Sequence, residues 1–281
     1  MSQPTPRHPG KFVWFEHLSG DRDAARRFYE ALFGWQVEAV PMGNGEPYPR
    51  ILNRGEAIGG LRSAPPGAPS LWMPYLSVTD VDASHAAALA AGAKSLMPPT
   101  DFAPVGRGAT LADPTGAAFS LWTSALGDRA DPATPPLGDW TWNELMTPDV
   151  PRALAFYARV FGYRHDTLAG GPQREYHLLK QGARMRGGVM PSPMPDTPPL
   201  WVPYVAVADC DATAAQGSVV APPRSADSAS PARRCTRRAP STAALPRRRC
   251  RRAARRSRSS GHRAPAEGSS ARSAASRSRW S

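Results

Sequence analysis

The chain has 281 residues, 41% of them hydrophobic, which is long for one compact domain and sufficient for two. Its formal charge of +12 is concentrated at one end: residues 224–281 hold 17 Arg against 2 acids, whereas residues 1–223 hold 18 Lys and Arg against 21 acids. The chain up to residue 223 is therefore mildly acidic, and its charge gives no reason to expect a nucleic-acid-binding body.

The cysteines indicate a reducing compartment, since Cys210, Cys235 and Cys250 match no zinc or disulfide spacing. No apolar run approaches the roughly 18 residues that span a bilayer. The N-terminal MSQPTPRHPG also lacks the apolar centre of a signal peptide. We therefore expect a cytoplasmic protein that does not contact membranes.

The first predicted unit is a strand over residues 11–19 followed by an amphipathic helix. Apolar residues recur at helical spacing from Ala25 to Phe33. Asp21 is placed to cap the start of this helix, and Gly34 to end it in a left-handed conformation. Three strand-like segments follow, at 35–42, 48–55 and 56–63. The unit is therefore βαβββ.

The same order then recurs along the chain. A second unit is predicted over 71–124, and the Pro-, Gly- and Asp-rich segment 125–137 is typical of a linker. From residue 138 the first unit returns, since WTWNELMTPDVPRALAFYARVFGY repeats the pattern of FVWFEHLSGDRDAARRFYEALFGW. LWVPYVAVADCDA then begins a fourth unit that matches LWMPYLSVTDVDA of the second. The predicted domains are 11–124 and 138–223.

Paired units of this kind, with FY and FG at the end of the first helix and DPTG before a late strand, resemble the vicinal oxygen chelate superfamily. That superfamily includes glyoxalase I, bleomycin-resistance proteins and extradiol dioxygenases. The WxEL…D…FY…FGW pattern is similar to its tandem, glyoxalase-like bacterial subgroup. The resemblance implies an α+β fold in which paired βαβββ modules form cup-shaped mixed sheets, in two tandem domains of which the second is incomplete.

Metal-dependent members of this superfamily place His or Glu ligands on inward-facing strand positions, so that a divalent ion can act as a Lewis acid on the substrate. The first-strand position, seven residues before the helix-capping Asp, holds Trp14 and Trp142 in the first and third units and Met73 and Val202 in the second and fourth. The late-strand position, seven residues after the Asp of DPTG, holds Ser120. No cofactor is therefore predicted, and an unconventional divalent metal site stays an alternative.

The carboxylate Glu16 lies two residues after Trp14 on the same face of the first strand, and Tyr75 is at the matching offset in the second unit. Glu16 could act as a general base, or Glu16 and Tyr75 could simply satisfy each other by a hydrogen bond. Glu16 is the one catalytic candidate. The residues predicted to bind a ligand are Trp14, Glu16, Tyr75, Ser120, Trp142, Glu144 and Tyr204.

Three histidines and two glycine pairs have simpler explanations. His17 points to the opposite face of the first strand from Glu16 and is predicted to be packed or exposed. His165 and His177 have no spacing that pairs them as metal ligands. The pairs Gly59-Gly60 and Gly187-Gly188 predict a backbone constraint, such as a bulge or a close approach of strands, and not a phosphate loop.

The favoured function is binding of a small organic molecule in the cup without the usual metal, as bleomycin-resistance-like members sequester theirs. The alternative is a glyoxalase-like lyase or related enzyme that uses Glu16 with Tyr75, or an unconventional metal site. A third class is non-specific association with nucleic acid through the basic end. Whether the protein is an enzyme is left open.

Residues 224–281 contain no Val, Ile, Phe, Met or Tyr and predict a disordered tail. They replace the late strands that the fourth unit should have, and Gly217 indicates a shortened fourth helix. Either the reading frame changes near residue 224 of a GC-rich gene, or the tail is a genuine basic arm. In both cases the second cup is incomplete, and exposed strand edges favour a homodimer or aggregation.

Overall fold

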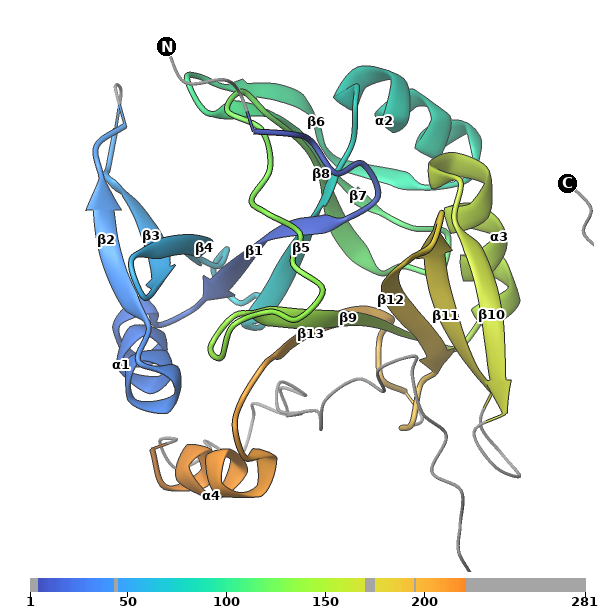
Figure 1. Cartoon of the computed structure of the whole chain (residues 1–281). Helices are drawn as coiled ribbons and strands as arrows, with labels where there is room; N and C mark the ends of the chain where they lie inside the picture. The colour runs from blue at the N-terminus through green and yellow to red at the C-terminus, as the bar shows by residue number, and fades with distance from the viewer. Residues whose placement is uncertain (1–4, 43–44, 170–174, 195, 221–281) are drawn as a thin grey trace, which may run out of the picture. The chain divides into compact units, whose positions relative to one another are not determined.

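The computed structural model of the chain describes residues 5–42, 45–169, 175–194 and 196–220 (Figure 1). Its first sheet contains β1 (Phe12–Ser19), β2 (Gln36–Val40), β3 (Tyr48–Asn53), β4 (Glu56–Ser63), β5 (Leu71–Ser77), β6 (Lys94–Phe102), β7 (Gly106–Ala112) and β8 (Ala118–Ser124). Its second contains β9 (Trp140–Thr147), β10 (Arg164–Ala169), β11 (Glu175–Gln181), β12 (Arg184–Pro191) and β13 (Leu200–Val205). The helices are α1 (Arg22–Phe33), α2 (Val81–Ala90), α3 (Val150–Phe161) and α4 (Cys210–Val220).

Both sheets are mixed. The strand order is β2-β3-β4-β1-β5-β8-β7-β6 in the first and β10-β11-β12-β9-β13 in the second. The first strands of neighbouring units pair antiparallel, β1 with β5 and β9 with β13, and each complete unit closes by pairing its first and last strands in parallel. This confirms the predicted α+β class and the paired βαβββ modules in mixed sheets.

The helix ends follow the local sequence as predicted. The Asp21 carboxylate accepts a hydrogen bond from the Ala24 amide at 2.9 Å at the start of α1, and Gly34 ends the helix with φ of 70°. In α3, Asp149 and Gly162 take the same two roles. These caps therefore fix where α1 and α3 begin and end.

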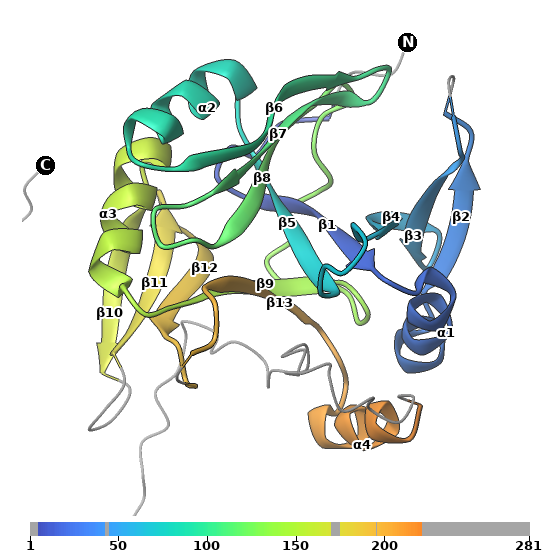
Figure 2. The same ribbon diagram turned by 180° about the vertical axis from the view of Figure 1, so that it is seen from behind.

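The two sheets share one hydrophobic core, which includes Phe119 of β8 and Tyr157 of α3. The ring centroids of these residues lie 5.7 Å apart, and the Tyr157 hydroxyl donates a hydrogen bond to Asp113 at 3.0 Å. The Trp201 indole of β13 donates in turn to the Tyr157 hydroxyl at 2.9 Å. Helices α2 and α3 lie side by side in both views (Figures 1 and 2). The second and third units are therefore joined by buried contacts.

The helices α1 and α3 have the same apolar stripe but different surroundings. Five residues of α3 are buried, whereas none of α1 is. The stripe of α3 is covered by β8 and the turn before it, and the corresponding strands of the fourth unit would follow α4, in residues 221–281, outside the described residues. Within the described ranges, the stripe of α1 is less covered than that of α3.

The expectation of a shortened fourth helix is wrong, because α4 has 11 residues and α2 has 10. Gly217 is buried inside α4 and does not end it. A glycine inside a helix is tolerated at a cost of about 1 kcal/mol relative to alanine. The neighbouring Gln216 side chain donates a hydrogen bond to the Ala31 carbonyl of α1 at 2.7 Å, which places α4 against α1.

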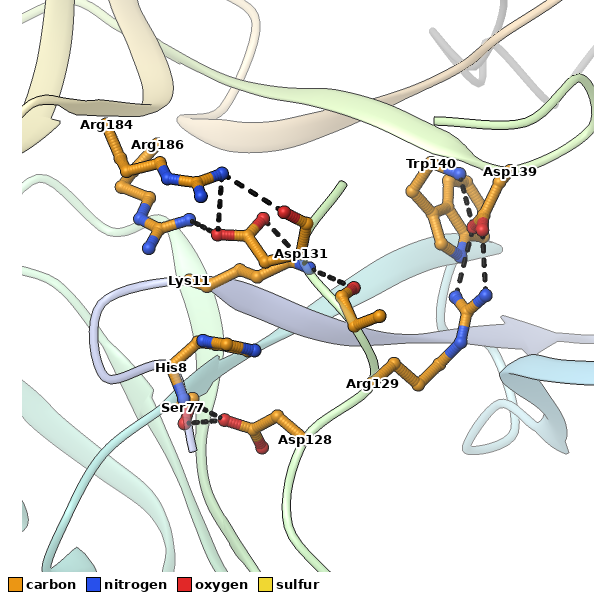
Figure 3. Close-up of polar contacts among 11 residues, drawn as sticks. His8, Lys11, Ser77, Asp128, Arg129, Asp131, Asp139, Trp140, Arg184 and Arg186 are labelled. Atoms are coloured by element: carbon orange, nitrogen blue, oxygen red, sulfur yellow. Dashed lines mark hydrogen bonds and ion pairs between the residues drawn. The ribbon is translucent and has the colours of Figure 1, made fainter. Parts of the chain in front are cut away.

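The predicted linker is tied to both sheets by its charged side chains (Figure 3). Asp128 accepts hydrogen bonds from the Ser77 hydroxyl and the His8 amide, both at 2.6 Å. The Asp131 carboxylate lies 3.1 Å from Lys11 and 2.7 Å from Arg186 of β12. The segment therefore contacts β5, the start of β1 and β12 through polar bonds.

The predicted basic tail lies outside the described residues. The frame change and the genuine basic arm therefore both stay hypotheses. Among the helices of the described ranges, none is long and apolar enough to cross a membrane.

We expect Phe156→Ala in α3 to lower the free energy of unfolding by about 3–5 kcal/mol, because the ring is buried against Phe119. The matched Phe28→Ala in α1 should cost about 1 kcal/mol, because Phe28 keeps part of its surface in water. Urea denaturation of both variants measures this difference. Equal losses would show that the α1 stripe is covered as well as that of α3.

We expect Asp131→Asn to lower the free energy of unfolding by about 3 kcal/mol, because it leaves the Arg186 guanidinium, 10% exposed, without a carboxylate. The control is Asp166→Asn, which removes an exposed ion pair with Lys180 and should cost under about 1 kcal/mol. Denaturant melts compare the two. A loss for Asp131→Asn no larger than the control's would contradict the proposed stabilisation.

Candidate functional site

The Glu16 carboxylate is the centre of a polar cluster on the first sheet. It is 3% exposed, and each of its oxygens accepts a tyrosine hydroxyl: Oε1 from Tyr48 at 3.0 Å and Oε2 from Tyr75 at 2.7 Å. The Trp14 indole donates to the Tyr48 hydroxyl at 3.1 Å. The hydrogen bond weighed as the packing alternative, between Glu16 and Tyr75, is therefore present, and it is part of a larger network.

The register of three strands brings these side chains together. Glu16 of β1 lies beside Gly60 of β4 and Trp14 opposite Tyr75 of β5. A Cβ atom at Gly60 would overlap the Tyr48 hydroxyl and come 3.0 Å from Glu16 Oε1. Tyr48 can therefore cross β4 and reach Glu16 only because residue 60 has no side chain.

Both tyrosines are held in their protonated form. Burial raises the pKa of the Tyr48 and Tyr75 hydroxyls well above their usual range, and the negative charge of Glu16 raises it further. At neutral pH they are hydrogen-bond donors, so the cluster presents one carboxylate with both oxygens already paired.

Ser120 lies on the same face, one strand further along. It is fully buried on β8, opposite Tyr75 in the parallel pairing of β5 and β8. Its hydroxyl also lies 2.9 Å from that of Thr110. Ser120 therefore supports Tyr75 from the second unit of the sheet.

The second sheet contains a copy of this cluster. Tyr204 donates to Glu144 at 2.7 Å, and the Trp142 indole donates to the Tyr176 hydroxyl at 2.7 Å. Burial raises the pKa of the Tyr176 hydroxyl, and the nearby charge of Glu144 raises it further. A Cβ at Gly188 would overlap the Tyr176 hydroxyl, as at Gly60. The network is thus a repeated unit of structure.

Of the seven predicted ligand-binding residues, the structure groups Trp14, Glu16, Tyr75 and Ser120 on the first sheet and the other three on the second. Tyr48 and Tyr176 were missed by the sequence analysis. The sequence repeat could have revealed them, because the two tyrosines occupy equivalent positions of its two copies, as Glu16 and Glu144 do.

The glycine pairs have the backbone role that was predicted. A Cβ at Gly59 would overlap the carbonyl oxygen of Phe15, and one at Gly187 would come 2.8 Å from that of Asn143. The first glycine of each pair therefore allows the last strand to approach the first strand, and the second admits a tyrosine.

His17 lies on the opposite face of β1 and is packed, which is one of the two alternatives, packed or exposed, that were predicted for it. It is buried among the rings of Tyr29 and Trp72, and burial lowers its pKa to about 4. His165 and His177 are brought together on β10 and β11, with ring centroids 5.5 Å apart. They line a hollow of about 450 Å³ beside α3 that contains no residue of either carboxylate cluster.

The donors of the first cluster do not fit the divalent ion that the resemblance implies. Glu16 is its one carboxylate, both of its oxygens accept hydroxyl groups, and the tyrosines are protonated at neutral pH. Trp14 and Met73 occupy first-strand positions where the superfamily places ligands, and an indole or a thioether does not suit a hard cation. In the part of the chain that is described, no three His, Cys, Asp or Glu residues are grouped to hold a metal.

Residues 15–122 match the family described as "Glyoxalase-like domain". The chain is 38% identical over 222 residues to the "Putative glyoxylase CFP32" of Mycobacterium tuberculosis, covering 75% of this chain and 84% of the relative. It is 30% identical over 236 residues to the "Anthracycline biosynthesis protein DauV" of Streptomyces sp., covering 73% of this chain and 80% of the relative.

Two solved structures show the same fold. One is a Mn(II)-bound glyoxalase from Novosphingobium aromaticivorans, with a TM-score of 0.51 and 20% identity over 74% of this chain and 68% of the other. The other is the 2,2',3-trihydroxybiphenyl 1,2-dioxygenase of Sphingomonas wittichii, with a TM-score of 0.50 and 14% identity. The match covers 75% of this chain and 78% of the dioxygenase chain. With its repeated βαβββ units and a 38% identical relative covered over most of its length, the chain belongs to the glyoxalase-like proteins of the vicinal oxygen chelate superfamily.

Proposed function

We propose that the face of the first sheet around Glu16 binds a small organic molecule without the superfamily's usual metal. The observation that supports this most is the buried carboxylate held by two tyrosine hydroxyls, on the face of β1 opposite the one where His17 contacts Tyr29 of α1. Buried polar groups beside aromatic rings are typical of sites that orient a small ligand. Trp14 and Tyr75 supply the rings, and the hydroxyl oxygens of Tyr48 and Tyr75 supply acceptors at fixed positions.

The cluster orients a ligand by fixed hydrogen-bond acceptors, because each tyrosine hydroxyl already donates its one proton to Glu16. Glu16 positions Tyr48 and Tyr75 by accepting one hydrogen bond from each, and Ser120 lies opposite Tyr75 on β8. A ligand hydroxyl or N–H group that reaches this face meets acceptor oxygens on side chains whose rotamers are already set, so little entropy is lost on binding. The low cysteine content supports action in the cytoplasm.

The second candidate is a glyoxalase-like lyase in which Glu16 takes a proton from the substrate. The relative named "Putative glyoxylase" and the buried position of the carboxylate favour it. Against it stand the two hydroxyl groups on the carboxylate, because they occupy one acceptor position on each oxygen and restrict a substrate proton to the positions that remain.

Metal analysis separates the proposed function from metal-dependent chemistry. We expect purified protein to contain well under one equivalent of divalent metal, and its Tm to be unchanged by added Mn²⁺ or Zn²⁺ after treatment with a chelator. Small organic ligands found by a Tm screen should instead stabilise it, and Tyr75→Phe should weaken their effect because it removes a fixed hydroxyl. Stoichiometric metal that activates turnover would overturn the metal-free proposal.

Glu16→Gln separates binding from base catalysis. We expect it to weaken ligand binding by about tenfold or less, since the amide keeps the shape of the carboxylate and loses only charge-assisted hydrogen bonds. Glu144→Gln makes the same change in the second sheet and is the control. Calorimetric titration gives the affinities. If Glu16→Gln leaves affinity intact but abolishes a measurable turnover, the lyase is the correct assignment.

A further inference from the structure

Two arginines lie beside the Glu16 cluster on the same sheet face. Arg62 follows Gly60 by two residues on β4, and its guanidinium is 3.7 Å from Glu16 Oε2. Arg50 follows Tyr48 by two residues on β3 and pairs across the strands with Gly60. Both arginine side chains therefore flank the position where Tyr48 meets the carboxylate.

The Arg62 side chain is available to a ligand. It is 54% exposed, and the contact with Glu16 is the one ion pair that it makes among the described residues. At 3.7 Å this contact is longer than a direct hydrogen bond, so it leaves the guanidinium donors unused. Arg50 differs, since its Nη2 donates to Glu38 at 2.6 Å, although its buried Nε has no partner within the described part of the chain.

The second sheet shows that these arginines are not needed to hold the carboxylate. At the equivalent positions of the repeat it has Leu178 in place of Arg50 and Met190 in place of Arg62. Yet Glu144 accepts the Tyr204 hydroxyl at 2.7 Å, the same distance as in the first cluster. The positive charge is therefore an addition to the first face and not part of the shared network.

An aromatic wall lies on the same face, on the other side of Glu16 from the arginines, on β5 and β8. Tyr75 and Trp122 meet at a ring-centroid distance of 6.1 Å and an interplanar angle of 77°, and Phe102 contacts Trp122 at 5.9 Å. A Cβ at Gly106 would come 2.7 Å from the Trp122 ring, and one at Gly108 3.0 Å. The two glycines of β7 therefore make the room that the indole occupies.

On the basis of the proposed function, we propose that the ligand of the first face is an organic acid with a flat apolar body. Its carboxylate pairs with the outer edge of the Arg62 guanidinium, whose planar donors match a carboxylate in two parallel hydrogen bonds. Its body lies against the rings of Tyr75 and Trp122. The second face, with Met190 and Leu178, has no cation at the matching positions and does not select an anion.

The test uses 2-naphthoate and its neutral analogue 2-naphthamide, which share an aromatic body and differ in charge. Titration calorimetry on the full chain should give at least tenfold tighter binding of the acid, and the preference should fall as salt screens the ion pair. Arg62→Met, which copies the second sheet, should reduce the ratio of the two affinities to about one. Arg62→Lys should keep part of the ratio, because it keeps the charge.

Two variants control for general effects. Arg27→Met removes an exposed charge on α1 and should leave the ratio unchanged. Tyr75→Phe should weaken both probes together, because it alters the shared cluster and not the charge. Thermal melts verify that each variant is folded.

The outcomes separate this inference from the proposed function. If both probes bind equally and both weaken in Tyr75→Phe, the face binds small molecules but does not select acids, and the inference is wrong. If the acid preference survives in Arg62→Met, another group provides it and the assignment of Arg62 is wrong. If neither probe binds, or Tyr75→Phe changes neither affinity, the proposed binding face is overturned as well.

Discussion

The close approach of β4 to β1 is the constraint on which the rest of this structure depends. It requires two successive glycines: Gly59 leaves space for a main-chain carbonyl of β1, and Gly60 leaves space for the Tyr48 hydroxyl. A side chain at residue 59 would separate the parallel pair that closes the first unit. A side chain at residue 60 would keep that pair but exclude Tyr48, so that the Glu16 carboxylate would lose one of its two hydroxyl partners.

A buried carboxylate is costly unless its oxygens are hydrogen-bonded, and both sheets offset this cost in the same way. In each sheet one tyrosine comes from the same unit as the glutamate and the other from the next unit, so the network joins the two units at the centre of the sheet. The network is thus part of the fold, and it also fixes the polar groups that a ligand would meet. The role of the network in the fold explains why the same residues occur in both sheets while the side chains around them differ.

The local sequence predicts most of the fold, and less of the site. Helix caps such as Asp21 and Gly34 depend on neighbouring residues, and the alternation of Trp14 and Glu16 with His17 follows from strand geometry, so both could be derived. Tyr48 could not be placed, because its contact with Glu16 depends on the pairing of β3 with β4 and on the space at residue 60. Likewise, the length of α4 was misjudged from a glycine whose burial only the tertiary structure defines.

The contact between Tyr157 and Asp113 has a consequence for how the two sheets could diverge. It joins the helix of one half of the chain to a turn of the other, which is the kind of contact that two identical subunits make across a twofold axis. Here the two halves belong to one chain, so the sequence of one half can change without changing the other. A homodimer must carry identical binding faces, whereas this chain has an arginine at residue 62 and a methionine at the equivalent residue 190. Covalent linkage is what permits one molecule to offer two differently charged faces on a single architecture.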